Sequence, residues 1–222
     1  MNAAVPALER TTTGSQVERV LREMILDGRL KPGTHLRETQ VARSLGVSRN
    51  TLREALRSLA EHGLVTHHPH RGVVVTDLTV ADVADLFRLR LVLEQAGLAS
   101  LSDTRELERA TDAFAAALER GDAVEALEED FRFHRALVAA LDSARLAAAH
   151  ERAQRELRLV LLQLDREYEP PQVEEHRAIL AAVVAGNQDA AAAALAAHLE
   201  RAAERLIVLI RVRESNPIER SE

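Results

Sequence analysis

Hydrophobic residues recur at helical spacing in segment after segment of this chain, and turn residues separate the segments. Up to residue 62 the pattern predicts three short helices, over 15–27, 38–45 and 49–62. Ser48 precedes the third helix, where a serine hydroxyl accepts a bond from a free backbone N–H and starts the helix. We expect the second helix to be capped by Thr39 or by the residue before it. Two strand-like segments follow at 64–66 and 73–75, with a loop at 67–72 between them.

Beyond residue 76 the chain shows helical spacing and no strand pattern. We expect six helices there, over about 80–100, 104–120, 123–141, 144–167, 171–185 and 188–213. The chain is therefore predicted to be mostly α. A disordered segment at 1–14 precedes a winged helix-turn-helix at 15–76, and an all-α helical bundle at 77–213 precedes a tail at 214–222.

Composition narrows the class of protein. The chain has 222 residues, enough for two modest domains, and no cysteine, which excludes disulfides and thiolate metal sites. The first ten residues lack the basic and apolar parts of a signal peptide. No apolar run reaches the ~20 residues that span a bilayer. These features predict a cytoplasmic protein without a membrane partner.

Charge is distributed unevenly along the chain. The net charge is −6, yet residues 1–76 hold 11 Lys+Arg against 7 Asp+Glu, and residues 77–222 hold 18 against 28. The positive excess lies in the predicted winged helix-turn-helix, as binding to DNA phosphates requires. Within it Arg49, Arg53 and Arg57 share one flank of the third helix. Such a row is ordinarily a solvated face, but the first turn of a recognition helix meets base edges, where the arginine fork matches guanine.

Three histidines are predicted to point into the core of the bundle. His134, His176 and His198 fall on the apolar stripes of the third, fifth and sixth bundle helices, and Asp130 lies one turn before His134. One inward histidine is ordinarily a satisfied core residue. Three of them with a carboxylate are costly to bury unless they share a partner. A divalent metal is such a partner, so we expect these four residues to be its ligands.

Arg90 is a further polar residue on a core stripe, in the helix at 80–100. It could clamp an effector carboxylate through two parallel bonds or form an ion pair with Glu94 one turn later, and both explanations stay open. Arg155 and Arg158 are weaker effector candidates that we expect to be exposed. His150 has no evident partner. No further inward Glu or Asp is evident as a general base, which argues against a metalloenzyme.

Three stretches of the first domain carry a family resemblance: Gly33–Glu38, Gly46–Leu56, and Gly63–Val65 together with Arg71–Val73. They resemble the DNA-binding domain of the GntR family of bacterial transcription regulators, whose usual recognition-helix pattern is S-R-T-P-V-R-E-A-L. This chain keeps both arginines of the pattern, Arg49 and Arg53. In place of the T-P-V between them it has the residues 50–52, Asn-Thr-Leu. The loop at 67–72 corresponds to the wing, and its histidines His67, His68 and His70 could instead form a metal cluster, although their place at a hairpin tip favours contact with a groove or phosphate. The resemblance implies contacts to double-stranded DNA from Arg37, Thr39, Arg49, Asn50, Thr51, Arg53, His70, Arg71 and Gly72.

The second domain resembles the FCD effector domain of the FadR-type branch of that family, through the stretches Asp130–His134, Glu175–Leu180 and His198–Leu199. The resemblance implies that Asp130, His134, His176 and His198 hold a divalent metal, with zinc expected first and nickel or manganese open. It also implies a small carboxylate effector, bound at or beside the metal and held by Arg90, and a homodimer that represses from a palindromic operator. The turn at 141–145 lacks the usual Gly-Asn pair. A pure metal sensor and, less favoured, a helical-bundle metalloenzyme remain as alternatives.

Overall fold

The computed structural model describes residues 12–26, 28–68, 72–164 and 173–215. The chain divides into two compact units, Met1–Asp77 and Leu78–Glu222. Each unit has its own buried apolar residues, and we describe the two separately.

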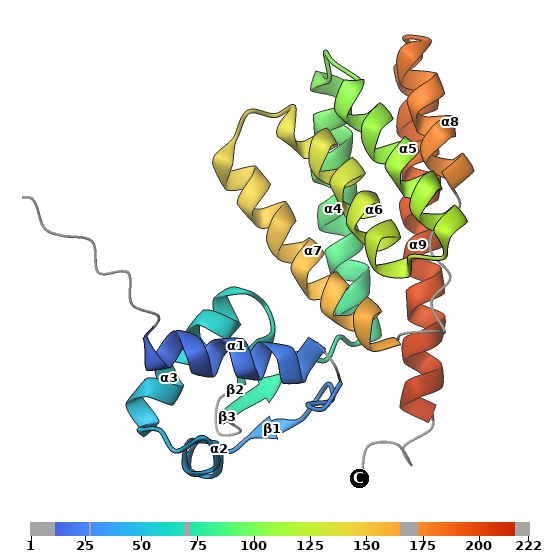
Figure 1. Cartoon of the computed structure of the whole chain (residues 1–222). Coiled ribbons are helices and arrows are strands. Elements are labelled where there is room, and N and C mark those ends of the chain that lie inside the picture. The colour runs from blue at the N-terminus through green and yellow to red at the C-terminus, as the bar shows by residue number, and fades with distance from the viewer. Residues whose placement is uncertain (1–11, 27, 69–71, 165–172, 216–222) are drawn as a thin grey trace, which may run out of the picture. The chain divides into compact units, whose positions relative to one another are not determined.

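The described part of the first unit contains three helices and a small antiparallel sheet (Figure 1). The strand order is β1-β3-β2, and Val65 of β2 pairs with Val75 of β3. Helices α1 and α3 pack together, because each buries one apolar stripe against the other. The elements are α1 (Thr13–Leu26), β1 (His35–Leu36), α2 (Glu38–Leu45), α3 (Arg49–Glu61), β2 (Val65–His68) and β3 (Gly72–Val75).

The turn between α2 and α3 follows from two residues. Gly46 adopts a left-handed conformation with φ 66°, which ends α2 without the steric cost that a side chain would add. Ser48 Oγ accepts the backbone N–H of Thr51 at 3.1 Å, so the predicted cap of α3 is confirmed. The predicted cap of α2 is wrong: Arg37 precedes that helix without a side-chain bond, and Thr39 lies inside it. Strand β1 was not predicted, because two residues are too few to show an alternation.

The second unit is a bundle of helices that lie alongside one another (Figure 1). Helix α4 packs against α6, α7 and α9, while α5 packs against α6 and α8, and α8 packs against α9. The prediction of a mostly α chain is confirmed. The end of the predicted helix at 144–167 and the start of the one at 171–185 lie outside the described residues. The elements are α4 (Val80–Ser100), α5 (Arg105–Arg120), α6 (Ala123–Ala139), α7 (Ala144–Leu164), α8 (Val173–Val184) and α9 (Gln188–Ser215).

One glycine brings α4 unusually close to α6. A Cβ atom at Gly97 would lie 2.1 Å from the carbonyl oxygen of Leu137, a distance that no side chain tolerates. Residues Glu94 and His134 each lie three positions earlier on the two helices, about one helical turn away. The close approach at Gly97 therefore helps to bring these two polar side chains together.

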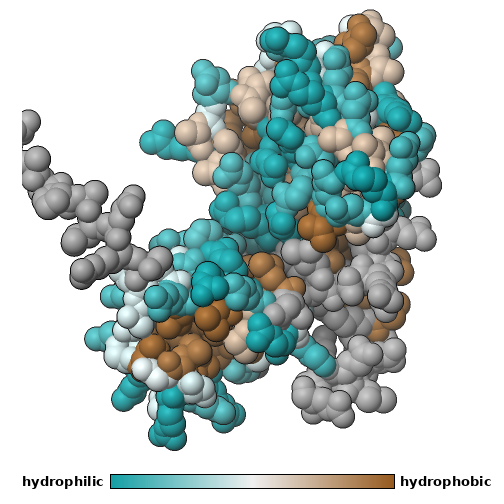
Figure 2. Space-filling model, viewed as in Figure 1, coloured by the Kyte–Doolittle hydropathy of each residue, from teal (hydrophilic) through white to brown (hydrophobic). Residues whose placement is uncertain are grey.

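The surface of the bundle is mainly hydrophilic on the face shown in Figure 2, with scattered hydrophobic residues. The largest buried apolar cluster joins side chains from α4, α5, α6, α7, α8 and α9. Among the described residues, none of the helices combines the length and the apolar character that a membrane span needs.

Candidate functional site

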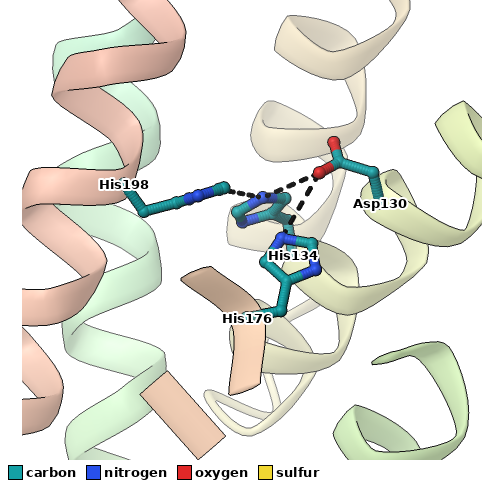
Figure 3. A group of neighbouring side chains, drawn as sticks. All are labelled: Asp130, His134, His176 and His198. Atoms are coloured by element: carbon teal, nitrogen blue, oxygen red, sulfur yellow. Dashed lines mark hydrogen bonds and ion pairs between the residues drawn. The ribbon is translucent and has the colours of Figure 1, made fainter. Parts of the chain in front are cut away.

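Four buried side chains meet inside the bundle (Figure 3). Asp130 and His134 come from α6, His176 from α8 and His198 from α9. Each offers one potential ligand atom, and these four atoms all lie within 4.8 Å of one another. The structure thus brings together the four residues that the sequence predicted as metal ligands, from segments up to 68 positions apart.

The ring nitrogens and the carboxylate converge on one small volume. His134 Nε2 lies 3.1 Å from His198 Nε2. Asp130 Oδ1 lies 3.3 Å from His176 Nε2 and 3.9 Å from His134 Nε2. These separations are close to what ligands around one shared ion require, since metal–nitrogen and metal–oxygen distances are about 2.0–2.2 Å.

Carboxylates behind two of the rings decide which nitrogens face the centre as ligands. Glu94 Oε2 lies 2.6 Å from His134 Nδ1, and Glu175 Oε2 lies 2.7 Å from His198 Nδ1. An ionised carboxylate only accepts, so both Nδ1 atoms donate, and each neutral ring keeps a lone pair on Nε2. Two lone pairs facing each other at 3.1 Å repel unless a cation lies between them. The donor set therefore fits a bound metal ion.

The pKa shifts favour the forms that bind metals. Burial lowers the pKa of His134 to about 3, and the nearby charge of Glu94 only partly opposes this. Burial also lowers the pKa of His198, against the opposing hydrogen bond with Glu175. Burial by itself raises the pKa of Asp130, but the close contact with His176, whose Nε2 lies 3.3 Å from Oδ1, and the surrounding histidines hold it well below its usual range. Neutral imidazoles and an ionised carboxylate follow near neutral pH.

Glu94 is completely buried and joins three other side chains. Its Oε1 accepts Arg90 Nε at 2.9 Å and His150 Nε2 at 2.9 Å, while Oε2 accepts His134 Nδ1. Of the two explanations for Arg90, the ion pair with Glu94 is therefore present. Arg90 is itself buried, and its Nη2 has no hydrogen-bond partner among the described residues.

The sequence indicated Glu94 only as a possible partner of Arg90 and gave no evident partner for His150. In the structure both side chains are buried, and His150 Nε2 donates to Glu94 Oε1. The expectation that no further Glu or Asp points inward was therefore wrong. The core stripe expected on this helix passed through Leu93 and left Glu94 beside it. A spacing of four, three, four and three was available as a signal, since the buried positions of α4 include Val83, Phe87, Arg90, Glu94 and Gly97.

A separate pocket of about 210 Å³ lies between α6 and α7. Its wall includes Arg155 and Arg158, which were expected to be exposed and are each partly exposed. Arg158 forms an ion pair with Glu128, and partial burial lowers the pKa of the Arg158 guanidinium. Three arginines line this pocket together with Glu151, and Arg155 forms an ion pair with that glutamate.

Five of the described residues expected to contact DNA lie at the starts of α2 and α3 in the first unit. Arg37 and Thr39 are exposed at the start of α2, and Arg49 and Asn50 are exposed in the first turn of α3 with the half-buried Thr51 beside them. Arg53 Nε donates to Glu38 Oε2 at 2.7 Å. Gly72 begins β3 with φ 77°. Candidates His70 and Arg71 lie outside the described residues.

Each of the two units corresponds to a known protein family or domain. Residues 13–75 match the model of the bacterial regulatory proteins of the gntR family, and residues 85–201 match that of the FCD domain. The chain belongs to the GntR family of bacterial transcription regulators. Because this family regulates transcription, the chain is a DNA-binding regulator with an FCD effector domain and not an enzyme.

Individual relatives extend the likeness along the chain. A probable D-xylose utilization operon transcriptional repressor of Paenarthrobacter nicotinovorans is 31% identical over 205 residues, 90% of this chain and 91% of the relative. An uncharacterized transcriptional regulator of Bacillus subtilis is 40% identical over 91 residues, which is 41% of each chain. The crystal structure of a putative GntR regulator from Rhodococcus sp. RHA1 has a TM-score of 0.69 at 32% identity, and the match covers 87% of this chain and 97% of that one.

Proposed function

We propose that this regulator binds a palindromic operator as a homodimer and that a divalent metal in its FCD domain takes part in sensing a small carboxylic acid. The observation that carries the sensing part is the convergence of Asp130, His134, His176 and His198 within 4.8 Å. Repression is the proposed direction, because a relative matched along most of this chain is named as a probable repressor.

DNA recognition is assigned to the first turn of α3, supported by the hairpin that follows it. Arg49 is exposed there and makes no ion pair among the described residues, so its guanidinium is available for base edges in the major groove. Arg53 already forms an ion pair with Glu38, so a contact from Arg53 to DNA would compete with that pair. Two recognition helices in a dimer imply half-sites that face the same side of the duplex.

Selection of bound sequences from random double-stranded DNA tests this assignment. On the selected operator, Arg49→Ala should cost about 1–3 kcal/mol of binding free energy and relax the preference at one base pair. Arg57→Ala, two turns further along α3, is the matched control and should weaken binding less. Equal losses for Arg49→Ala on the operator and on random DNA would show that Arg49 does not read sequence.

The homodimer is supported by apolar side chains exposed on the bundle. Leu89 and Val92 on α4, and Val208 and Val212 on α9, are all at least 37% exposed, and these two helices pack together. A second copy of the chain covering these residues would remove apolar surface from water. A symmetric dimer also matches the two-fold symmetry of a palindromic operator.

The metal would be held by the four clustered ligands, and it would stabilise the folded bundle because the unfolded chain does not assemble them. Saturation at ~1,000 times the dissociation constant stabilises a protein by about 4 kcal/mol. Chelation should therefore lower the melting temperature, and His176→Ala or His198→Ala should reproduce that loss, because α8 and α9 each supply one ligand. Elemental analysis then distinguishes zinc from nickel and manganese. A melting curve unchanged after verified metal removal would refute the site.

Electrostatics supports an acid as the effector. The buried Arg90, Glu94 and Asp130 together carry one negative charge, so a divalent ion would leave the centre with one positive charge. That balance suits a carboxylate, which Arg90 Nη2 could also bind. A tetrahedral zinc would be filled by four protein ligands, whereas a six-coordinate metal keeps about two positions for water or effector. The effector must bind one arrangement of the DNA-binding domains better than the other to release DNA.

Isothermal titration of a panel of carboxylates into metal-loaded and metal-free protein tests the sensing role. We expect binding to the loaded form only, together with loss of operator affinity. Equal binding to both forms, with both folded, would move the effector away from the metal, and the arginine-lined pocket between α6 and α7 would then be examined next. A change in operator affinity with metal alone, and with no acid, would instead identify a metal sensor.

A further inference from the structure

Behind the metal ligand His134 lies a carboxylate that touches no ligand position itself. His134 Nδ1 lies 2.6 Å from Glu94 Oε2, on the side of the ring away from the other ligands. We propose that Glu94 is a positioning residue of the metal centre, because it fixes the His134 tautomer that leaves Nε2 free to bind the ion. This inference rests on the metal site proposed above.

The bonding of Glu94 leaves one proton arrangement. Its Oε1 faces Arg90 Nε and His150 Nε2, and its Oε2 faces His134 Nδ1. A carboxylate only accepts hydrogen bonds, so all three partners donate. A neutral imidazole has one N–H, and with that proton on Nδ1 the lone pair of His134 lies on Nε2, toward the cluster. A carboxylate behind a ligating histidine orients the ring and raises its basicity in the same way at other metal sites.

The three histidines are not held alike. Glu175 repeats the arrangement behind His198, and its second oxygen accepts Arg201 Nε at 2.8 Å. Neither ring nitrogen of His176 has a hydrogen-bond partner among the described residues. Its ring instead stacks on Phe133, with centroids 4.1 Å apart and planes 5° from parallel. Glu94 and Glu175 thus fix two tautomers in advance, while the tautomer of His176 is left to the ion.

The substitution Glu94→Gln reverses the proton arrangement without changing the size of the side chain. The single amide oxygen must stay toward Arg90, because a guanidinium only donates. The amide NH₂ then faces His134 Nδ1, which must accept, so the ring proton moves to Nε2 and blocks the ligand position. Glu175→Gln should act on His198 in the same way, because Arg201 retains the oxygen.

Zinc titration and nitrogen NMR of the full-length chain test the proposal together. With the metal removed, ¹⁵N spectra of the histidine rings should show Nδ1–H for His134 and His198 in the wild type. Glu94→Gln should move only the His134 proton to Nε2 and lower zinc affinity by about ten- to a hundredfold. Asp85→Asn is the matched control, because Asp85 lies exposed on the same helix, and it should change neither quantity.

The possible failures are distinguishable. A wild type that binds no metal refutes the proposed function. A wild type that binds zinc, with Glu94→Gln binding equally well and keeping the Nδ1–H signal of His134, overturns this inference alone. If Glu94→Gln does not fold, the metal-free wild type still decides, because a folded wild type with His134 protonated on Nε2 contradicts the proposal.

Discussion

At the scale of single residues, the centre of the bundle is governed by how each buried charge finds a partner. Arg90 and Glu94 are 3% and 0% exposed, and they pair with each other through a bond of 2.9 Å. A buried ion pair stabilises a protein little compared with apolar residues of similar volume, but a buried charge that has lost its partner is strongly unfavourable. Arg90 therefore stabilises Glu94 whether or not it also binds an effector.

Replacing Arg90 by alanine should consequently destabilise the metal-free protein by about 3–5 kcal/mol, because the Glu94 carboxylate stays buried without its cation. Urea unfolding of the metal-free chain measures the change. Arg88→Ala is the control, since Arg88 is 74% exposed in its ion pair with Asp85 and exposed pairs contribute about 0–1 kcal/mol. Similar losses for the two variants would show that the buried pair contributes no more than a surface pair.

At the scale of secondary-structure elements, local signals decided where helices begin and end. Ser48 starts α3 as predicted, and Thr79 with Asp82 forms a full capping box at the start of α4. The contact between α4 and α6 depends instead on a residue whose role no local signal reveals. Gly97 lies within the last turn of α4, and glycine inside a helix ordinarily lowers stability by about 1 kcal/mol relative to alanine.

In this helix Gly97→Ala should have the opposite effect and lower stability by about 1–3 kcal/mol or more, because the new methyl group would overlap the carbonyl of Leu137. It should also lower metal affinity, since separating α4 from α6 moves Glu94 away from His134. Thermal unfolding and metal titration provide the two readings. Ser100→Ala, at an exposed position of α4, should leave both nearly unchanged. An alanine variant more stable than the wild type would contradict the close packing.

At the scale of the whole molecule, the buried charges make the effector domain sensitive to acid. The folded pKa of His134 is about 3 and that of Glu175 is about 2, and the pKa values of Asp130 and His198 are also lowered. Unfolded histidine and glutamate take up protons at about 6.5 and 4.3 respectively. All four groups therefore bind more protons when the chain unfolds, so acid favours unfolding.

We expect the stability of the metal-free chain to be greatest above about pH 6.5 and to fall steadily as the pH is lowered toward 3. Metal binding to the folded chain should weaken only toward the acid end of that range, because the folded His134 takes up its proton near pH 3 and must lose it to bind. Urea midpoints measured between pH 7.5 and pH 4 test this. Stability that stayed constant or rose on acidification would contradict the buried, deprotonated cluster.

Assembly can be tested at the same scale. Val92→Glu introduces a charge on the exposed apolar residues of α4 and should weaken the proposed dimer more than tenfold, as measured by sedimentation equilibrium. Val184→Glu on α8 is the matched control, since the two valines are 63% and 67% exposed. Loss of the dimer with both variants, or with neither, would place the interface elsewhere.

By itself the sequence determined the order and type of the elements apart from β1, and the identity of the four clustered residues. Helical spacing and caps depend on residues a few positions apart, and an inward histidine can be recognised from the apolar residues that share its helix face. Each can therefore be predicted from a short stretch of sequence. Only the tertiary structure decided that Glu94 lies behind His134, that His150 binds Glu94 and that Arg90 is paired. These contacts join residues up to 56 positions apart on α4, α6 and α7. They depend on how closely the helices pack. Gly97 permits the close approach of α4 to α6 because it lacks a side chain where the Leu137 carbonyl of the other helix lies, and residues near Gly97 in the sequence do not reveal this contact.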